Sequence, residues 1–182
     1  MKKFLAVAAV IAACGLSAYA EDVKSGLDKG ARVPAFYVTD VTGPLKGEEL
    51  CYRCRYGNRP VVSIFAKEMT DEVAALTKEV DQVVGKNRDQ KMAGFVVVMT
   101  TDAAKTKPAL EEVAKKHSIE QVPLTTFDGT NGPEGYNINT KADVTVMMWV
   151  DGKVTASHAF NKGGLTKEAI SKVVGETKSI LE

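Results

Sequence analysis

The sequence is poor in metal-binding residues and has no excess of charge of either sign. It contains three cysteines, two histidines and one tryptophan, and 24 Lys and Arg stand against 23 Asp and Glu, for a net charge of +1. A nearly neutral chain has no large electrostatic field, so neither nucleic acid nor an anionic membrane is an expected partner. A closed zinc site needs four ligands, more than one cysteine pair supplies. We therefore expect no metal and no cofactor.

The chain also has no internal repeat, no low-complexity tract and no proline- or glycine-rich linker. About 160 residues is an ordinary size for one domain with a hydrophobic core of its own. We therefore expect residues 21–182 to form a single domain.

Residues 1–20 have the pattern of a secretory signal peptide. Two lysines precede a short apolar run at 4–13, and Ala18 and Ala20 occupy the two positions that a signal peptidase reads. The apolar run is too short to span a bilayer. Cleavage after Ala20 would leave 22 cations against 23 acids, a net charge of −1, because the removed segment holds two lysines and no acid.

A second interpretation of the same segment is lipid anchoring. Residues 11–14, Ile-Ala-Ala-Cys, resemble a bacterial lipobox, in which Cys14 would carry the lipid and tie the protein to a membrane. With either signal the protein is exported, to the bacterial periplasm or the medium. Disulfides persist in those compartments.

The other two cysteines, Cys51 and Cys54, form a C-x-x-C pair. Arg53 and Arg55 lie beside them, and nearby cations favour the thiolate, which is the form that exchanges with disulfides. Three interpretations stay open. One sulfur attacks a partner protein's disulfide and the other resolves the intermediate; or the pair is a structural disulfide on a non-catalytic scaffold that binds a peptide; or it supplies half of a zinc or copper site.

Hydrophobic patterning predicts a mixed α/β fold. A polar, loose lead-in covers residues 21–31, a basic, aromatic loop 52–59 and a long loop 128–140. Strands are expected at 35–40 and 47–51 as a hairpin, then at 61–66, 94–99, 121–127, 144–150 and 153–160. Helices are expected after Thr70, around Pro108 and over 166–180. Parallel βαβ units followed by an antiparallel hairpin give a mixed sheet with helices on both faces.

This order resembles the redoxin branch of the thioredoxin-like fold, which includes peroxiredoxins and exported TlpA-like thioredoxins. Residues 30–36, Gly-x-x-Val-Pro-Ala-Phe, resemble the G-x-x-A-P-x-F opening of those proteins, and 42–50 resemble their first hairpin. Residues 60–65 resemble the strand before their active site, and 143–154 their late strand and hairpin. The resemblance implies a thioredoxin-like fold over residues 30–180 and thiol chemistry with protein partners.

The chain departs from this family at two positions. Peroxiredoxins place C-T-x-E after the strand, and the matching residues here are Met69, Thr70 and Glu72 around Asp71, so methionine replaces the reactive cysteine. A thioether cannot become a thiolate, and peroxidase chemistry at this place is therefore not expected. Thioredoxins carry a cis-proline before a threonine, where this chain has Val144 and Thr145. A cis bond before valine is costly, so we expect a trans peptide there.

Overall fold

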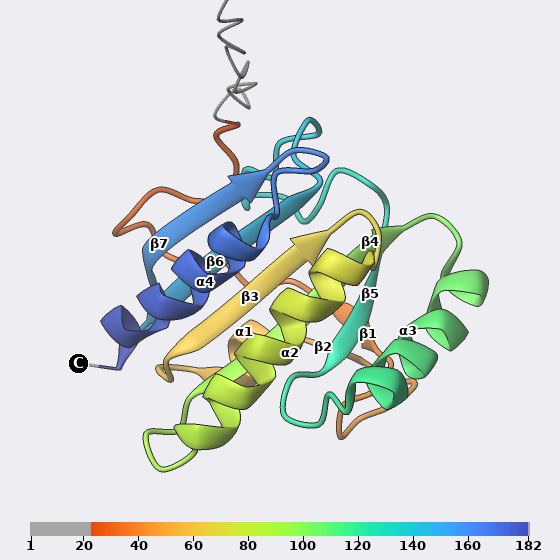
Figure 1. Cartoon of the computed structure of the whole chain (residues 1–182), viewed down its shortest axis with the longest axis horizontal. Helices are drawn as coiled ribbons and strands as arrows, with labels where there is room; N and C mark the ends of the chain where they lie inside the picture. Colours follow the sequence, from red (N-terminus) through yellow and green to blue (C-terminus); the bar gives the residue numbers. More distant parts are fainter. Residues whose placement is uncertain (1–22, 182) are drawn as a thin grey trace, which may run out of the picture.

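The computed structural model describes residues 23–181, arranged around one seven-stranded sheet. The expected signal peptide and lipobox, with Cys14, lie outside the described residues. In chain order the elements are β1 Val38–Asp40, β2 Glu49–Leu50, α1 Tyr52–Tyr56, β3 Val61–Ala66, α2 Asp71–Lys86, β4 Ala93–Thr100, α3 Ala103–His117, β5 Leu124–Asp128, β6 Val144–Val150, β7 Lys153–Phe160, α4 Lys167–Glu176 and a 3₁₀ turn Thr177–Ile180. The strand order is β2-β1-β5-β4-β3-β6-β7. This is the mixed α/β sheet that the sequence predicts (Figure 1).

The three central strands β3, β4 and β5 are parallel, and the four outer strands run antiparallel to their neighbours. All six residues of β3 are buried, as expected for an apolar run that is covered on both faces. Crossovers between parallel strands are right-handed, and the chain steps from β3 to β4 to β5 in one direction. The helices α2 and α3 therefore lie on the same face of the sheet.

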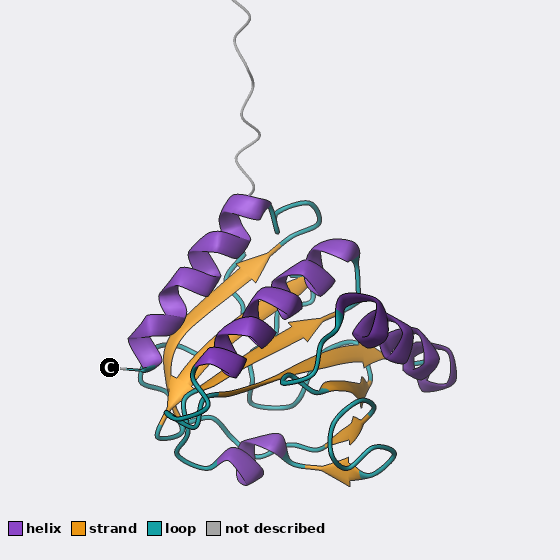
Figure 2. Ribbon diagram, turned by 60° about the horizontal axis from the view of Figure 1, so that its bottom comes forward, coloured by secondary structure: helices purple, strands orange, loops and turns teal. Residues whose placement is uncertain are grey.

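Helices occupy both faces, but unequally. Helices α2, α3 and α4 pack on one face over a core that includes Val62, Ile64 and Val96. On the other face lies the short helix α1, together with the lead-in before β1 and the loop before β6 (Figure 2). That second core is rich in aromatic rings, including Phe65, Phe95 and Trp149. We call these the α2 face and the α1 face.

Strands β1, β2 and β5 are shorter than the expected 35–40, 47–51 and 121–127. Two further segments differ in kind from their expected structure. Residues 52–59 begin with a helix, because Cys51 caps the turn and Gly57, at φ 59°, ends it. The lead-in is not loose: Ser25 Oγ and Thr145 Oγ1 are 2.7 Å apart, and the backbone N–H of Gly30 donates to the carbonyl of Val154. These contacts join residues more than 100 positions apart, which local sequence patterns do not predict.

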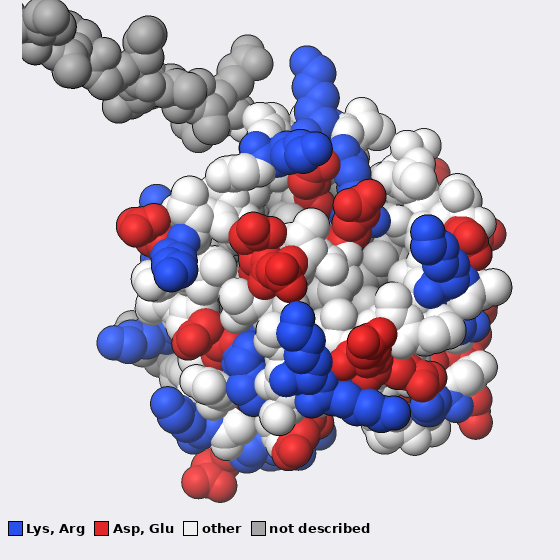
Figure 3. Space-filling model, turned by 45° about the vertical axis from the view of Figure 1, so that its right-hand side comes forward, with Lys and Arg blue, Asp and Glu red and all other residues white. Residues whose placement is uncertain are grey.

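Charged side chains of both signs are interspersed over the face seen in Figure 3. Within residues 23–181, no helix is long and apolar enough to span a bilayer.

Candidate functional site

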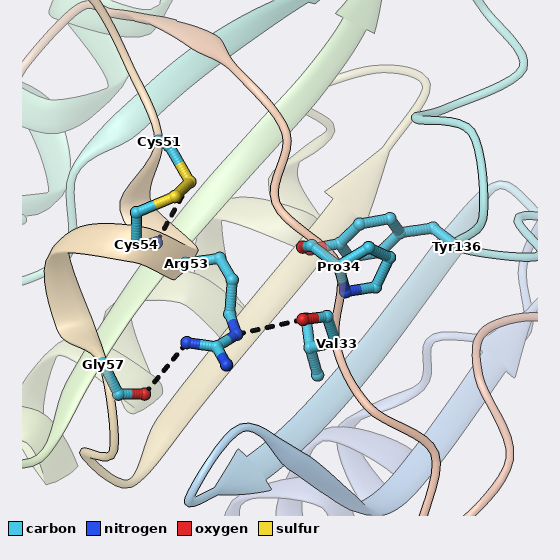
Figure 4. Close-up of a disulfide and its surroundings, with 7 residues drawn as sticks. All are labelled: Val33, Pro34, Cys51, Arg53, Cys54, Gly57 and Tyr136. Atoms are coloured by element: carbon cyan, nitrogen blue, oxygen red, sulfur yellow. Dashed lines mark hydrogen bonds between the residues drawn. A yellow bond between two sulfur atoms is a disulfide. The ribbon is translucent and has the colours of Figure 1, made fainter.

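Cys51 and Cys54 are joined as a disulfide at the beginning of α1 (Figure 4). Strand β2 ends at Leu50, and Cys51 is the residue that caps the helix. Its Sγ accepts a hydrogen bond from the backbone N–H of Cys54 at 3.0 Å, and the two Cα atoms are 5.2 Å apart. The C-x-x-C spacing thus places both sulfurs in one helical turn.

The two cysteine residues differ in their exposure to solvent. Cys51 is buried, with 7% of its surface exposed, whereas Cys54 lies in an exposed part of the helix. A disulfide exchanges only when a thiolate can reach one of its sulfurs. The bond is therefore open to attack from one side, at Cys54.

Arg53 fastens the disulfide-bearing helix to two other segments. Its Nε donates to the carbonyl of Val33 at 3.1 Å and its Nη1 to the carbonyl of Gly57 at 3.1 Å. A Cβ on Gly152 would collide with the Arg53 guanidinium, so the turn between β6 and β7 also packs against it. The sequence singled out Arg53 for its charge, and the structure adds an anchoring role. Arg55 is exposed.

Tyr52 and Tyr56 pack onto the sheet. Their ring centroids are 5.2 Å apart, and the Tyr52 ring stacks on Phe95 at 5.3 Å. The Tyr52 hydroxyl donates to Asp40 Oδ2 at 3.0 Å and the Tyr56 hydroxyl to the carbonyl of Gly94 at 3.2 Å. Burial, followed by the negative charge of Asp40, raises the pKa of both phenols. These rings fix α1 to the α1 face.

Comparison with known proteins identifies this architecture through structure alone. No protein-family model matches the sequence, and no curated protein matches it either. A protein described as a thiol:disulfide interchange protein DsbE, from Chlorobium tepidum, superposes with a TM-score of 0.61 at 14% identity and covers 86% of this chain and 99% of its own. The chain has the thioredoxin-like fold of the redoxins.

Two other solved structures represent the range of that fold. Peroxidoxin BcpB from Mycobacterium tuberculosis has a TM-score of 0.57 at 16% identity and covers 84% of this chain and 97% of its own. A secreted Mycobacterium tuberculosis disulfide oxidoreductase, homologous to E. coli DsbE, has a TM-score of 0.56 at 13% identity. It covers 79% of this chain and 95% of its own. The neighbours thus include both thiol–disulfide proteins and a peroxidoxin.

The position at which peroxiredoxins carry their reactive cysteine corresponds here to the connection between β3 and α2. Met69 is partly buried against the α2-face core. Thr70 caps α2, and its Oγ1 accepts the backbone N–H of Val73 at 3.3 Å. Hydrogen bonds with Thr70 and with its own backbone lower the pKa of the exposed Glu72. This position has the structure of a well-capped helix start, without a thiol.

Val144 and Thr145, at the cis-proline position of the family, point to opposite faces. Residues 23–181 contain no cis peptide bond, so the trans prediction is confirmed. Val144 lines a cavity of about 830 Å³ together with Thr70 and Glu72. Thr145 is buried beneath the lead-in, where its hydroxyl meets Ser25. Thr70, Glu72 and Val144 therefore lie around one cavity, whereas Met69 and Thr145 are not among its lining residues.

The cysteine pair is not part of that cavity. Tyr52, between the two cysteines, belongs to the core of the α1 face, whereas Met69 and Val144 contact the core of the α2 face. The relocated C-x-x-C and the altered redoxin site thus lie on opposite faces of the sheet. Any thiol chemistry at Cys51 and Cys54 takes place without Thr70 or Glu72.

The histidines lie apart from the sulfurs as well. His158 is on β7, with its Nε2 2.7 Å from Oε2 of Glu176, and His117 is in the last turn of α3. No group of three or more His, Cys, Asp and Glu side chains in the described part of the chain is arranged to hold a metal ion.

Sequence reasoning missed two residues that support the site. Asp40 is 1% exposed, and its carboxylate accepts the backbone N–H groups of Gly43 and Leu45 at 2.7 and 2.9 Å besides the Tyr52 hydroxyl. An aspartate two residues before a Thr-Gly-Pro turn is a usable signal for such a contact. Tyr136 is fully buried and donates to the carbonyl of Pro34 at 2.7 Å. Its glycine-rich loop gives no comparable signal.

Proposed function

We propose that this protein is an exported thiol–disulfide oxidoreductase or redox sensor that exchanges disulfides with protein thiols through Cys51 and Cys54. The observation that carries the proposal is a closed disulfide between one exposed and one buried cysteine residue. The thiol–disulfide proteins among the structural neighbours support it.

The disulfide's position supports exchange over peroxidase chemistry. The disulfide lies at the beginning of a short helix that is fixed by Tyr52, Arg53 and Tyr56. An anchored helix presents the exposed sulfur in one orientation, which lowers the ordering cost of docking. Met69 cannot supply a thiolate at the family's peroxidatic position.

The test is catalysis with a disulfide protein such as insulin, together with the reduction potential of the 51–54 disulfide. The wild type is expected to accelerate insulin reduction by dithiothreitol, and Cys51→Ser and Cys54→Ser are expected to lose this. A potential above about −300 mV is expected for an exchanging disulfide. Insulin reduction that persists in both serine variants would disprove the proposal.

A second candidate is a non-catalytic redoxin-like domain in which the disulfide is structural. The burial of Cys51 and the anchoring of Arg53 favour this candidate, because both are features of a fixed loop. Closing so short a loop stabilises the fold by about 2 kcal/mol in the chain-entropy model. This candidate would be supported against the first by three results together. Reducing the disulfide would lower the free energy of unfolding by about that amount, the reduction potential would lie below about −300 mV, and no insulin reduction would be catalysed.

A further inference from the structure

The two cysteines of the disulfide differ in their exposure to solvent. Cys51 is buried at the end of β2, whereas Cys54 is exposed, three residues further along α1. Because access decides which sulfur of a disulfide is attacked, an incoming thiolate meets Cys54 first.

A hydrogen bond makes the sulfur of Cys51 the better leaving group of the two. The backbone N–H of Cys54 points at Cys51 Sγ from 3.0 Å. When the S–S bond breaks, the electron pair remains on Cys51, and this hydrogen bond becomes charge-assisted and favours the thiolate. Attack at Cys51 would instead leave the thiolate on Cys54, which receives no hydrogen bond among those of the described residues.

The surface beside Cys54 carries unpaired cations. Arg55 and Arg59 are exposed, and neither forms an ion pair within residues 23–181. Arg88 belongs to the neighbouring loop, which the backbone bond from Ala93 N–H to the carbonyl of Pro60 holds beside this segment. The nearby acids Glu48, Glu49 and Asp89 are also exposed and pair with none of these arginines. Local positive charge attracts anionic substrates and speeds their approach.

We propose that Cys54 is the sulfur that forms the mixed disulfide with a partner, and that Arg55 and Arg59 select partners whose thiol is flanked by carboxylates. This inference rests on the proposed function, and it assigns an attack order and a substrate class to the same disulfide.

The exchange proceeds in two steps. A partner thiolate attacks Cys54 Sγ, the Cys51–Cys54 bond breaks, and the electron pair goes to Cys51 as a thiolate. A second thiolate of the partner then attacks the partner's sulfur in the mixed disulfide and releases Cys54. The partner loses two electrons and two protons to become a disulfide, and the protein's disulfide becomes two thiols.

The attack order is tested in the full chain with Cys14→Ser as background, so that Cys51 and Cys54 are the only thiols. Cys51→Ser leaves Cys54 free, and serine is itself a good helix cap, so α1 is retained. Cys54→Ser leaves Cys51 free and keeps the backbone N–H that faces it. Mixed-disulfide formation with oxidised glutathione is followed by mass spectrometry. Cys54 is expected to react at least about tenfold faster than Cys51, because attack requires an accessible sulfur.

The substrate class is tested in the Cys51→Ser protein with two small disulfides of opposite charge, oxidised glutathione and cystamine. The rate of the protein with each disulfide is divided by the rate at which free cysteine reacts with the same disulfide in the same buffer. The glutathione preference is the ratio of the normalised rate with oxidised glutathione to the normalised rate with cystamine. This ratio is expected to fall severalfold in Arg55→Gln/Arg59→Gln. It is also expected to fall when salt is raised from about 0.02 to 0.5 M, because salt screens the charges. Lys172→Gln/Lys178→Gln, which removes two exposed cations from the α4 side, is the matched control and is expected to keep it.

The possible failures are distinguishable. If Cys51 reacts as fast as Cys54, the attack order is wrong while disulfide exchange stands. If glutathione and cystamine are treated alike with or without the arginines, the substrate class is wrong. If neither cysteine reacts and the wild-type disulfide catalyses no insulin reduction, the proposed function itself fails.

Discussion

Arg53 shows how a residue next to a reactive group can serve the fold. Its guanidinium binds two backbone carbonyls and packs against the β6–β7 turn, where Gly152 has a φ of 68°. Hydrogen bonds from a charged donor to partly buried carbonyls contribute about 1.5–3 kcal/mol. The anchoring of α1 thus depends on one arginine and on the absence of a side chain opposite it.

Gly152→Ala is expected to destabilise the protein more than Gly163→Ala does. Both glycines have positive φ, at 68° and 77°, so both variants carry the backbone strain of about 1 kcal/mol or more. Only the Cβ at position 152 meets Arg53, whereas nothing lies within 4 Å of a Cβ at 163. Urea unfolding measures the difference. Equal losses in the two variants would contradict the packing of Arg53 against the turn.

Tyr136→Ala is expected to cost about 3–5 kcal/mol, the range for removing a large buried aromatic side chain. The ring is fully buried between Phe36 and Phe65, at centroid distances of 4.7 and 5.3 Å. Tyr37→Ala removes the same side chain from a position that is 60% exposed, and a change within about 0.5 kcal/mol is expected there. Similar losses at both positions in chemical denaturation would refute the account of the α1-face core.

At the scale of elements, the start of α2 has kept its structure without a cysteine. Thr70 caps the helix, with Asp71 and Glu72 in the first turn, where the helix dipole favours acids. The cap belongs to the α2 face, and the disulfide belongs to the α1 face. We therefore expect the stability supplied by this cap to be separable from any thiol chemistry at the disulfide.

Thr70→Ala is expected to lower the free energy of unfolding by about 1 kcal/mol, and Thr70→Ser by much less, because serine retains the capping oxygen. Neither substitution is expected to change the rate of disulfide exchange, since Thr70 and Cys54 lie on opposite faces. Parallel measurements of unfolding and of insulin reduction test this. A loss of exchange in Thr70→Ala at unchanged stability would place the altered redoxin position in the mechanism.

At the scale of the whole molecule, the α1 face contains three tyrosines whose ionisation the fold opposes. Burial raises the pKa of Tyr52, Tyr56 and Tyr136 above the ordinary value of 10.0. The folded protein therefore holds these protons more tightly than the unfolded chain does. The contribution of these three protonated phenols to the free energy of unfolding is complete below about pH 10 and is lost as the pH rises further.

The free energy of unfolding is accordingly expected to fall as the pH rises from about 10 to about 11, with phenolate absorbance rising late and together with unfolding. Urea unfolding across this range, with recovery checked at pH 8, measures the effect. Tyr52→Phe is expected to flatten the pH dependence, because the Tyr52 ring is buried. Three phenols that ionise near pH 10 without loss of stability would contradict their burial.

The sequence by itself determined most of the scaffold. Strands β3, β6 and β7 have the expected bounds, because few structures other than a strand can bury a short apolar run or one face of an alternating run. The start of α2 was predicted because Thr70 and the acids after it act within one turn. The β6–β7 turn followed from Asp151 and Gly152, which have the positive φ values that a two-residue hairpin needs.

The tertiary structure alone decided how the site is built. It placed the cysteines and the altered redoxin position on opposite faces, buried Cys51 while exposing Cys54, and joined Arg53 and Tyr136 to the carbonyls of Val33 and Pro34 ahead of β1. Each of these outcomes depends on contacts between segments far apart in the chain. Local sequence patterns determine a turn or the period of a strand. Whether a given side chain is buried or exposed depends on which distant segments pack against it.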